Sequence, residues 1–67
     1  MREILERLID EMVTKGIRFE DAQREFEKHF IAKALSSTGG NFSRAAELLG
    51  IHRNTLSRKV SEYRLRH

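Results

Sequence analysis

The sequence of 67 residues contains no cysteine, no proline and no tryptophan. Without cysteine it can form neither a disulfide nor a thiolate metal site, which are common means of stabilising a very small domain. Without proline no helix interior is interrupted, and the four glycines stand at the ends of apolar periodic segments. This pattern predicts an all-α chain with short connections. Because a chain this short buries only about 60% of its unfolded surface, a second subunit is the remaining source of stability.

Long apolar runs are also missing. Segments such as Phe30-Ile31-Ala32 are only a few residues long, whereas a membrane-spanning helix needs about 20. No stretch has the charged start and apolar centre of a signal peptide. We therefore expect a cytoplasmic protein that does not associate with a membrane.

The residue patterns of catalysis are absent as well. The sequence shows no pairing of a nucleophile with a base, no phosphate-binding loop and no metal-ligand spacing. Acidic residues in the first forty positions alternate with Arg and Lys at four-residue spacing, which is typical of solvated helix faces. We expect a protein that is not an enzyme and that uses no cofactor, no metal and no small-molecule substrate.

Positive charge is concentrated at one end of the chain. Residues 1–40 carry seven basic and eight acidic side chains, whereas residues 41–67 carry six basic ones (Arg66 among them) and only Glu47 and Glu62 as acidic ones. A basic segment of this kind is typical of a nucleic-acid-binding protein. On charge alone, however, a solvated basic helix face is the favoured explanation, and the charge becomes informative only together with the motif that carries it.

Two amphipathic helices are predicted in the first half. Residues 2–15 place Ile4, Leu8 and Met12 on one stripe, and Gly16 suits the position just past the helix end. A longer helix is predicted from Phe19 to Ser37. Its apolar stripe consists of Phe19, Ala22, Phe26, Phe30 and Ala34, and Ile31 and Leu35 widen this stripe. Aromatic residues at helical spacing indicate core or dimer packing rather than a ligand pocket.

Two shorter helices are predicted in the second half. Asn41 can cap a helix from Phe42 to Leu49, in which Phe42 is expected to be exposed. A turn at Gly50-Ile51 precedes a last helix from Arg53 to Arg64. The inner face of this last helix is expected to consist of Leu56, Val60 and Tyr63.

The spacing from Asn41 to Leu65 predicts a helix-turn-helix. Ala46 is the small residue that such a motif needs where its helices approach, Gly50 allows a left-handed turn, and Ile51 supplies an apolar plug. The outer face of the last helix then presents Arg53 and Asn54, which are suited to guanine and adenine edges in a major groove. A helical hairpin with a polar outer face is the alternative without DNA binding.

The same stretch resembles the DNA-binding domain of the Fis family, which includes a bacterial nucleoid protein and the terminal domains of NtrC-type activators. The resemblance covers residues 24–65 and rests on the segment Gly40-Asn41-x-Ser43-Arg44-Ala45-Ala46-x-Leu48-Leu49-Gly50-Ile51-x-Arg53-x-Thr55-Leu56-x-Arg58-Lys59-Val60. The preceding Phe26-x3-Phe30-Ile31-x2-Ala34-Leu35 is similar to the family's dimerisation helix.

The resemblance implies a fold and a set of contacts. Four helices per subunit would form an intertwined homodimer, with dimer contacts from Leu8, Met12, Phe19, Phe26 and Phe30. The two helix-turn-helix units would enter successive major grooves of double-stranded DNA. By position, the residues facing DNA would be Asn41, Ser43, Arg44, His52, Arg53, Asn54, Thr55, Arg58 and Lys59. His52 is interpreted equally well as a phosphate contact or as a neutral residue at a helix start.

We therefore expect residues 1–67 to form one Fis-like domain, with dimerisation helices in 1–38 and the helix-turn-helix in 41–65. The expected function is sequence-preferring DNA binding by a transcriptional regulator or nucleoid-associated protein. Two closely spaced reading heads would also bend the duplex. The alternative is a helical interaction module whose basic end docks on an acidic partner. The operator, the choice between activation and repression, and whether the chain is free-standing or part of a larger regulator stay open.

Overall fold

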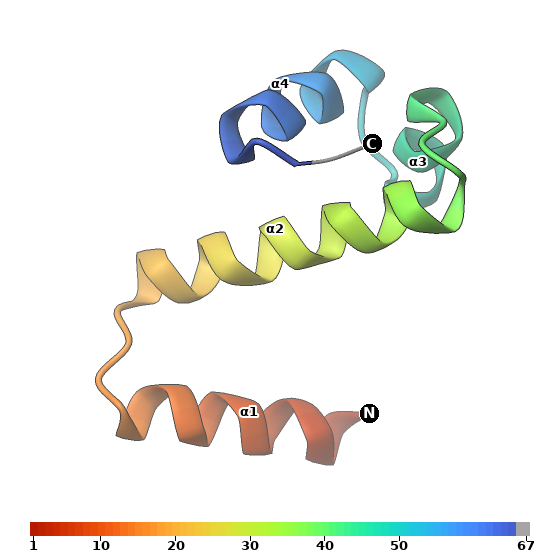
Figure 1. Ribbon diagram of the computed structural model, residues 1–67. Coiled ribbons are helices and arrows are strands. Elements are labelled where there is room, and N and C mark those ends of the chain that lie inside the picture. Colours follow the sequence, from red (N-terminus) through yellow and green to blue (C-terminus); the bar gives the residue numbers. More distant parts are fainter. Residues whose placement is uncertain (66–67) are drawn as a thin grey trace.

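The computed structural model describes residues 1–65, which form four helices and contain no strand (Figure 1). The helices are α1 (Arg2–Thr14), α2 (Phe19–Ser37), α3 (Phe42–Leu49) and α4 (Arg53–Tyr63). The all-α prediction is therefore confirmed, with bounds within one residue of those expected. Helix α4 ends one residue early because Arg64 takes a left-handed conformation, with φ of 54°.

A small apolar core joins the second half of α2 to α3 and α4. Leu35 and Leu56 are its largest fully buried side chains, and the core as a whole comprises Ile31, Ala34, Leu35, Ala45, Ala46, Leu56 and Val60. Burying a leucine side chain in this way stabilises the fold by about 1.5–3 kcal/mol. Helices α3 and α4 are thereby fixed against α2, and both lie above it in Figure 1, α3 at its C-terminal end and α4 over its middle.

Several half-buried side chains surround this core, namely Phe42, Leu49, Ile51, Tyr63 and Leu65. The expectation that Phe42 is exposed was wrong, because its ring packs against the core at the start of α3. Leu49 is one of these half-buried residues, whereas its neighbour Leu48 is 67% exposed. An eight-residue helix packed on two neighbours has one outward side, and Leu48 lies on it.

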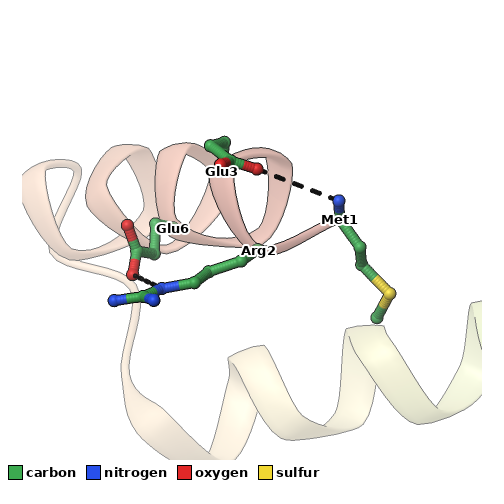
Figure 2. Close-up of polar contacts among 4 residues, drawn as sticks. All are labelled: Met1, Arg2, Glu3 and Glu6. Atoms are coloured by element: carbon green, nitrogen blue, oxygen red, sulfur yellow. Dashed lines mark hydrogen bonds and ion pairs between the residues drawn. The ribbon is translucent and has the colours of Figure 1, made fainter.

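Helix α1 buries none of its residues in the single chain. It is joined to α2 by a short connection, and the two helices run in roughly opposite directions (Figure 1). Its polar contacts near the N-terminus are local to the helix: the amino group lies 4.0 Å from Glu3, and Arg2 Nε donates to Glu6 Oε1 at 3.2 Å (Figure 2). Contacts of this kind support a helix but do not attach it to the core.

Within residues 1–65, no helix has both the length and the hydropathy that a membrane span requires.

Candidate nucleic-acid interface

The turn between α3 and α4 sets the relative orientation of the two helices. Gly50 has φ of 68°, a conformation that a side chain would disfavour. Its N–H donates to the carbonyl of Glu47 at 3.2 Å, and the N–H of Ile51 donates to that of Ala46 at 3.1 Å. These two bonds satisfy carbonyls at the end of α3 and form a Schellman motif. Ile51 is thereby directed onto the core, as the spacing predicted.

The two alanines of α3 allow the helices of the motif to approach closely. Ala45 is fully buried and Ala46 is 4% exposed. Both lie in the same cluster as Leu56 and Val60 of α4. A larger side chain at either position would have to displace one of these helices. The helix-turn-helix register predicted from the sequence is therefore the one that the structure contains.

The start of α4 is capped by a histidine. His52 Nδ1 accepts a hydrogen bond from the backbone N–H of Asn54 at 3.0 Å. A neutral imidazole that accepts through Nδ1 carries its proton on Nε2, so this second nitrogen is available as a donor. Arg53 and Asn54 follow directly and are exposed. The positive end of the helix dipole, together with these donors, favours an anionic group such as a phosphate here.

The start of α3 has a similar arrangement. Asn41 Oδ1 accepts from the backbone N–H of Arg44 at 3.1 Å, which confirms the predicted cap. Ser43 and Arg44 are exposed in the first turn of this helix. Residues at the starts of both motif helices thus present donors to solvent, which is the arrangement that the expected phosphate contacts require.

The nine residues expected to face DNA differ in exposure. Thr55 and Lys59 are half-buried, while the others are exposed, namely Asn41, Ser43, Arg44, His52, Arg53, Asn54 and Arg58. Arg58 lies on the outer side of α4, together with Ser57. Arg66, counted in the basic segment, lies outside the residues described.

Lys59 lies toward α2 rather than on the outer side of α4. Its Nζ forms an ion pair with Glu27 Oε1, and the two side chains are 27% and 31% exposed. Tyr63 Oη donates to the other carboxylate oxygen of Glu27 at 2.7 Å. These hydrogen bonds, from Lys59 first and then from Tyr63, lower the pKa of the Glu27 carboxyl, and the bond to Glu27 raises the pKa of the Tyr63 hydroxyl.

Sequence reasoning missed this arrangement, which we call the Glu27 cluster (Glu27, Lys59 and Tyr63). The spacing offered one signal. Lys59 lies three residues after Leu56 and four before Tyr63, both of which were expected on the inner face, so Lys59 borders that face. The partner of Lys59 is 32 positions away in the sequence, and nothing local identifies it.

The residues expected at a dimer interface lie mostly on the surface of the single chain. Leu8, Phe19, Phe26 and Phe30 are exposed by 49%, 79%, 59% and 53%, and Met12 is half-buried. The rings of Phe26 and Phe30 contact each other, with centroids 5.3 Å apart. They border a groove between α2 and the helix-turn-helix whose other apolar walls are Ile31, Leu49 and Ile51. The rings of Phe26 and Phe30 beside this groove therefore stay uncovered in the single chain.

No group of His or acidic side chains within residues 1–65 has the arrangement of a metal site.

Comparison with known proteins gives a consistent family. Residues 22–63 match the model of the family described as bacterial regulatory protein, Fis family. The chain is 42% identical over 53 residues to the DNA-binding transcriptional regulator NtrC of Azospirillum brasilense, a match that covers 79% of this chain and 11% of that protein. It is 52% identical over 42 residues to a Fis-like DNA-binding protein of Xylella fastidiosa, covering 63% of this chain and 47% of that protein.

A third relative, NtrC of Rhizobium meliloti, is 37% identical over 62 residues, which cover 92% of this chain and 13% of that regulator. The chain thus spans about a tenth of the NtrC regulators and about half of the Fis-like protein. No solved structure gave a significant match. The chain belongs to the Fis family, whose helix-turn-helix domains bind DNA in transcriptional regulators.

Proposed function

We propose that this member of the Fis family binds double-stranded DNA as a homodimer, with α4 of each subunit in a major groove and a preference for particular sequences. The observation that supports this most directly is that Arg53, Asn54 and Arg58 are exposed on α4, a helix held by the core and by the hydrogen-bonded turn before it. These side chains have the donors and acceptors that distinguish guanine and adenine in the major groove. None of the three residues belongs to the apolar core.

Eight of the nine residues are proposed to contact DNA directly. Arg53, Asn54, Thr55 and Arg58 would meet base edges or phosphates along α4. Asn41, Ser43 and Arg44 would hold a phosphate at the start of α3, while the Nε2 proton of His52 would hold another at the start of α4. Phosphate contacts at two helix starts would fix the register of the recognition helix, and base contacts would supply the preference.

The dimer is proposed from the apolar surface that a single chain leaves uncovered. Helix α1 has no buried residue, although Ile4, Leu8 and Ile9 lie in its sequence at helical spacing. Helix α2 has buried residues only from Ile31 onward, and the part before Ile31 exposes Phe19, Phe26 and Phe30. A second copy with the same surface would cover both helices. In this proposal residues 1–38 supply dimerisation and residues 41–65 supply DNA recognition within one domain.

A dimer with two recognition helices on one side would engage two successive major grooves. Two such contacts on one face of the duplex favour bending, so part of the preference would come from DNA deformability. This predicts a regulator or nucleoid-associated protein of the bacterial cytoplasm without enzymatic activity. The exposed cations are also the reason to test docking on an acidic protein as the alternative.

A competition experiment tests the proposal. A labelled duplex recovered by selection is bound in moderate salt and then challenged with excess unlabelled duplex of unrelated sequence. DNA recognition predicts that binding survives the unrelated competitor and is lost to the unlabelled selected duplex. Equal displacement by both duplexes would contradict sequence preference. Heparin, an unstructured polyanion, serves as the control for charge alone.

A further inference from the structure

The Glu27 cluster connects the helix proposed for dimerisation to the helix proposed for DNA recognition. Glu27 lies in α2 between Phe26 and Phe30, and each of its two carboxylate oxygens contacts a side chain of α4. Oε1 pairs with Lys59 and Oε2 accepts from Tyr63, which is four residues, or about one helical turn, further along α4. By contrast, ion pairs such as Arg2–Glu6 stay within one helix.

Two attachment points one turn apart constrain α4 more than one would. The core contacts of Leu56 and Val60 hold α4 near α3 and α2, but apolar packing is not directional. A carboxylate that is hydrogen-bonded at both oxygens fixes the rotation of α4 about its axis and its tilt on α2. Part of this constraint is shielded from water, since Lys59 and Glu27 are 27% and 31% exposed.

We propose that Glu27 is a positioning residue for DNA recognition, which sets the angle of α4 on α2 and thereby the spacing between the two recognition helices of the dimer. Lys59 then serves this cluster and is not a phosphate contact. This inference rests on the proposed function, because it assigns a role within sequence-preferring binding by a dimer. The lowered pKa of the Glu27 carboxyl agrees with a carboxylate that stays ionised in the cluster.

The first part of the proposal concerns spacing. The test measures binding to three duplexes of equal length: one with the selected site, one with a base pair inserted at its centre, and one of random sequence. Wild type is expected to lose about tenfold or more in affinity on insertion, as for a mismatch in a specific site. Glu27→Gln is expected to lose clearly less than wild type on insertion, while its affinity for the random duplex stays within about twofold, since no phosphate contact is removed.

The second part concerns Lys59. Arg58→Met is expected to lower the slope of log K against log salt concentration by about two units, because a dimer contains the residue twice and each copy would lose one phosphate contact. Lys59→Met is expected to leave this slope unchanged and to widen the tolerated spacing as Glu27→Gln does. A slope reduced equally by both substitutions would overturn the assignment of Lys59.

Two controls separate positioning from a general loss of stability or charge. Glu25→Gln removes the same charge from an exposed residue of α2 and is expected to behave as wild type. Ile31→Val weakens the core beside the cluster and is expected to lower stability without changing spacing tolerance. If Glu27→Gln does not fold, Tyr63→Phe removes only the hydroxyl and is expected to widen the tolerance in part.

The outcomes distinguish the inference from the function on which it rests. A wild type that binds the selected and random duplexes equally overturns both. A wild type that prefers the selected site, with the spacing tolerance of Glu27→Gln and Tyr63→Phe unchanged, overturns the positioning role alone. Wider tolerance in Ile31→Val, equal to that of Glu27→Gln, would also overturn it, because loss of stability would then be the cause.

Discussion

Replacing Phe30 with alanine tests the proposed dimer at the centre of its apolar surface. A phenylalanine side chain presents about 200 Å², and Phe30 is 53% exposed in the single chain. A partner that covers the remainder removes about 100 Å² from water, worth up to about 2.5 kcal/mol at 25 cal/mol per Å². Because a symmetric dimer contains the residue twice, Phe30→Ala is expected to weaken association by up to about 5 kcal/mol.

That loss corresponds to an increase of up to about 3.6 orders of magnitude in the dimer dissociation constant, at 1.4 kcal/mol for each tenfold change. Sedimentation equilibrium over a dilution series measures this constant directly. Leu48→Ala is the matched control, because Leu48 is also exposed in the single chain but lies on α3, away from the proposed interface. A dissociation constant for Phe30→Ala that equals that of Leu48→Ala would refute the interface.

Four further substitutions test other parts of the account. Arg53→Ala is expected to weaken binding to a selected duplex by about 1–3 kcal/mol and to relax the preference; fluorescence anisotropy that shows unchanged discrimination would sink this assignment. Ala46→Leu is expected to overpack the motif at a cost of about 1–3 kcal/mol, and unaltered thermal unfolding and DNA affinity would count against the helix contact described. Asn41→Ala is expected to lower the free energy of unfolding by about 1 kcal/mol through loss of the α3 cap, whereas Asn41→Ser should retain most of it in the same denaturation series. Folding lowers the pKa of the Glu27 carboxyl from 4.5, so the ionised carboxylate stabilises the fold above pH 4.5, and this stability is lost as the pH falls below 4.5. Glu27→Gln should therefore flatten the acidic part of a plot of unfolding free energy against pH. A variant that keeps the wild-type slope there would contradict the cluster.

The helices and the motif could be predicted from the sequence because they depend on local rules. Apolar periodicity defines α2 and α4, Asn41 is a strong capping residue, and Gly50 permits the turn that α3 requires. Each of these signals lies within a few residues of the feature that it predicts. The match between the expected and observed bounds follows from this short range.

The apolar stripe of α2 shows where local rules end. The sequence pattern continues from Phe26 through Phe30 to Ala34, yet Ala34 is buried and the two rings are exposed. The two rings border the groove between α2 and the helix-turn-helix, whereas Ala34 lies within the core, and this division depends on packing between distant segments. Periodicity gives the direction of a side chain from its own helix but not what lies opposite it.

Lys59 illustrates the same point within the candidate site. Its place in a basic motif favoured a DNA contact, but the structure gives it a carboxylate partner from α2. Whether a cation at the border of a helix face turns outward or inward depends on the residue opposite it, and Glu27 is 32 positions away. Arg53 and Arg58 differ because they are exposed on α4.

Selection of bound duplexes from a random pool tests the central proposal most directly. A homodimer with α4 of each subunit in successive major grooves predicts enriched sequences that form inverted repeats, with half-site centres about 10 base pairs apart. Arg53→Ala should change the enriched bases within each half-site and leave the spacing between half-sites unchanged. Enrichment of single, unpaired half-sites would contradict the dimer, and a pool that stays random after repeated rounds would contradict sequence-preferring DNA recognition itself.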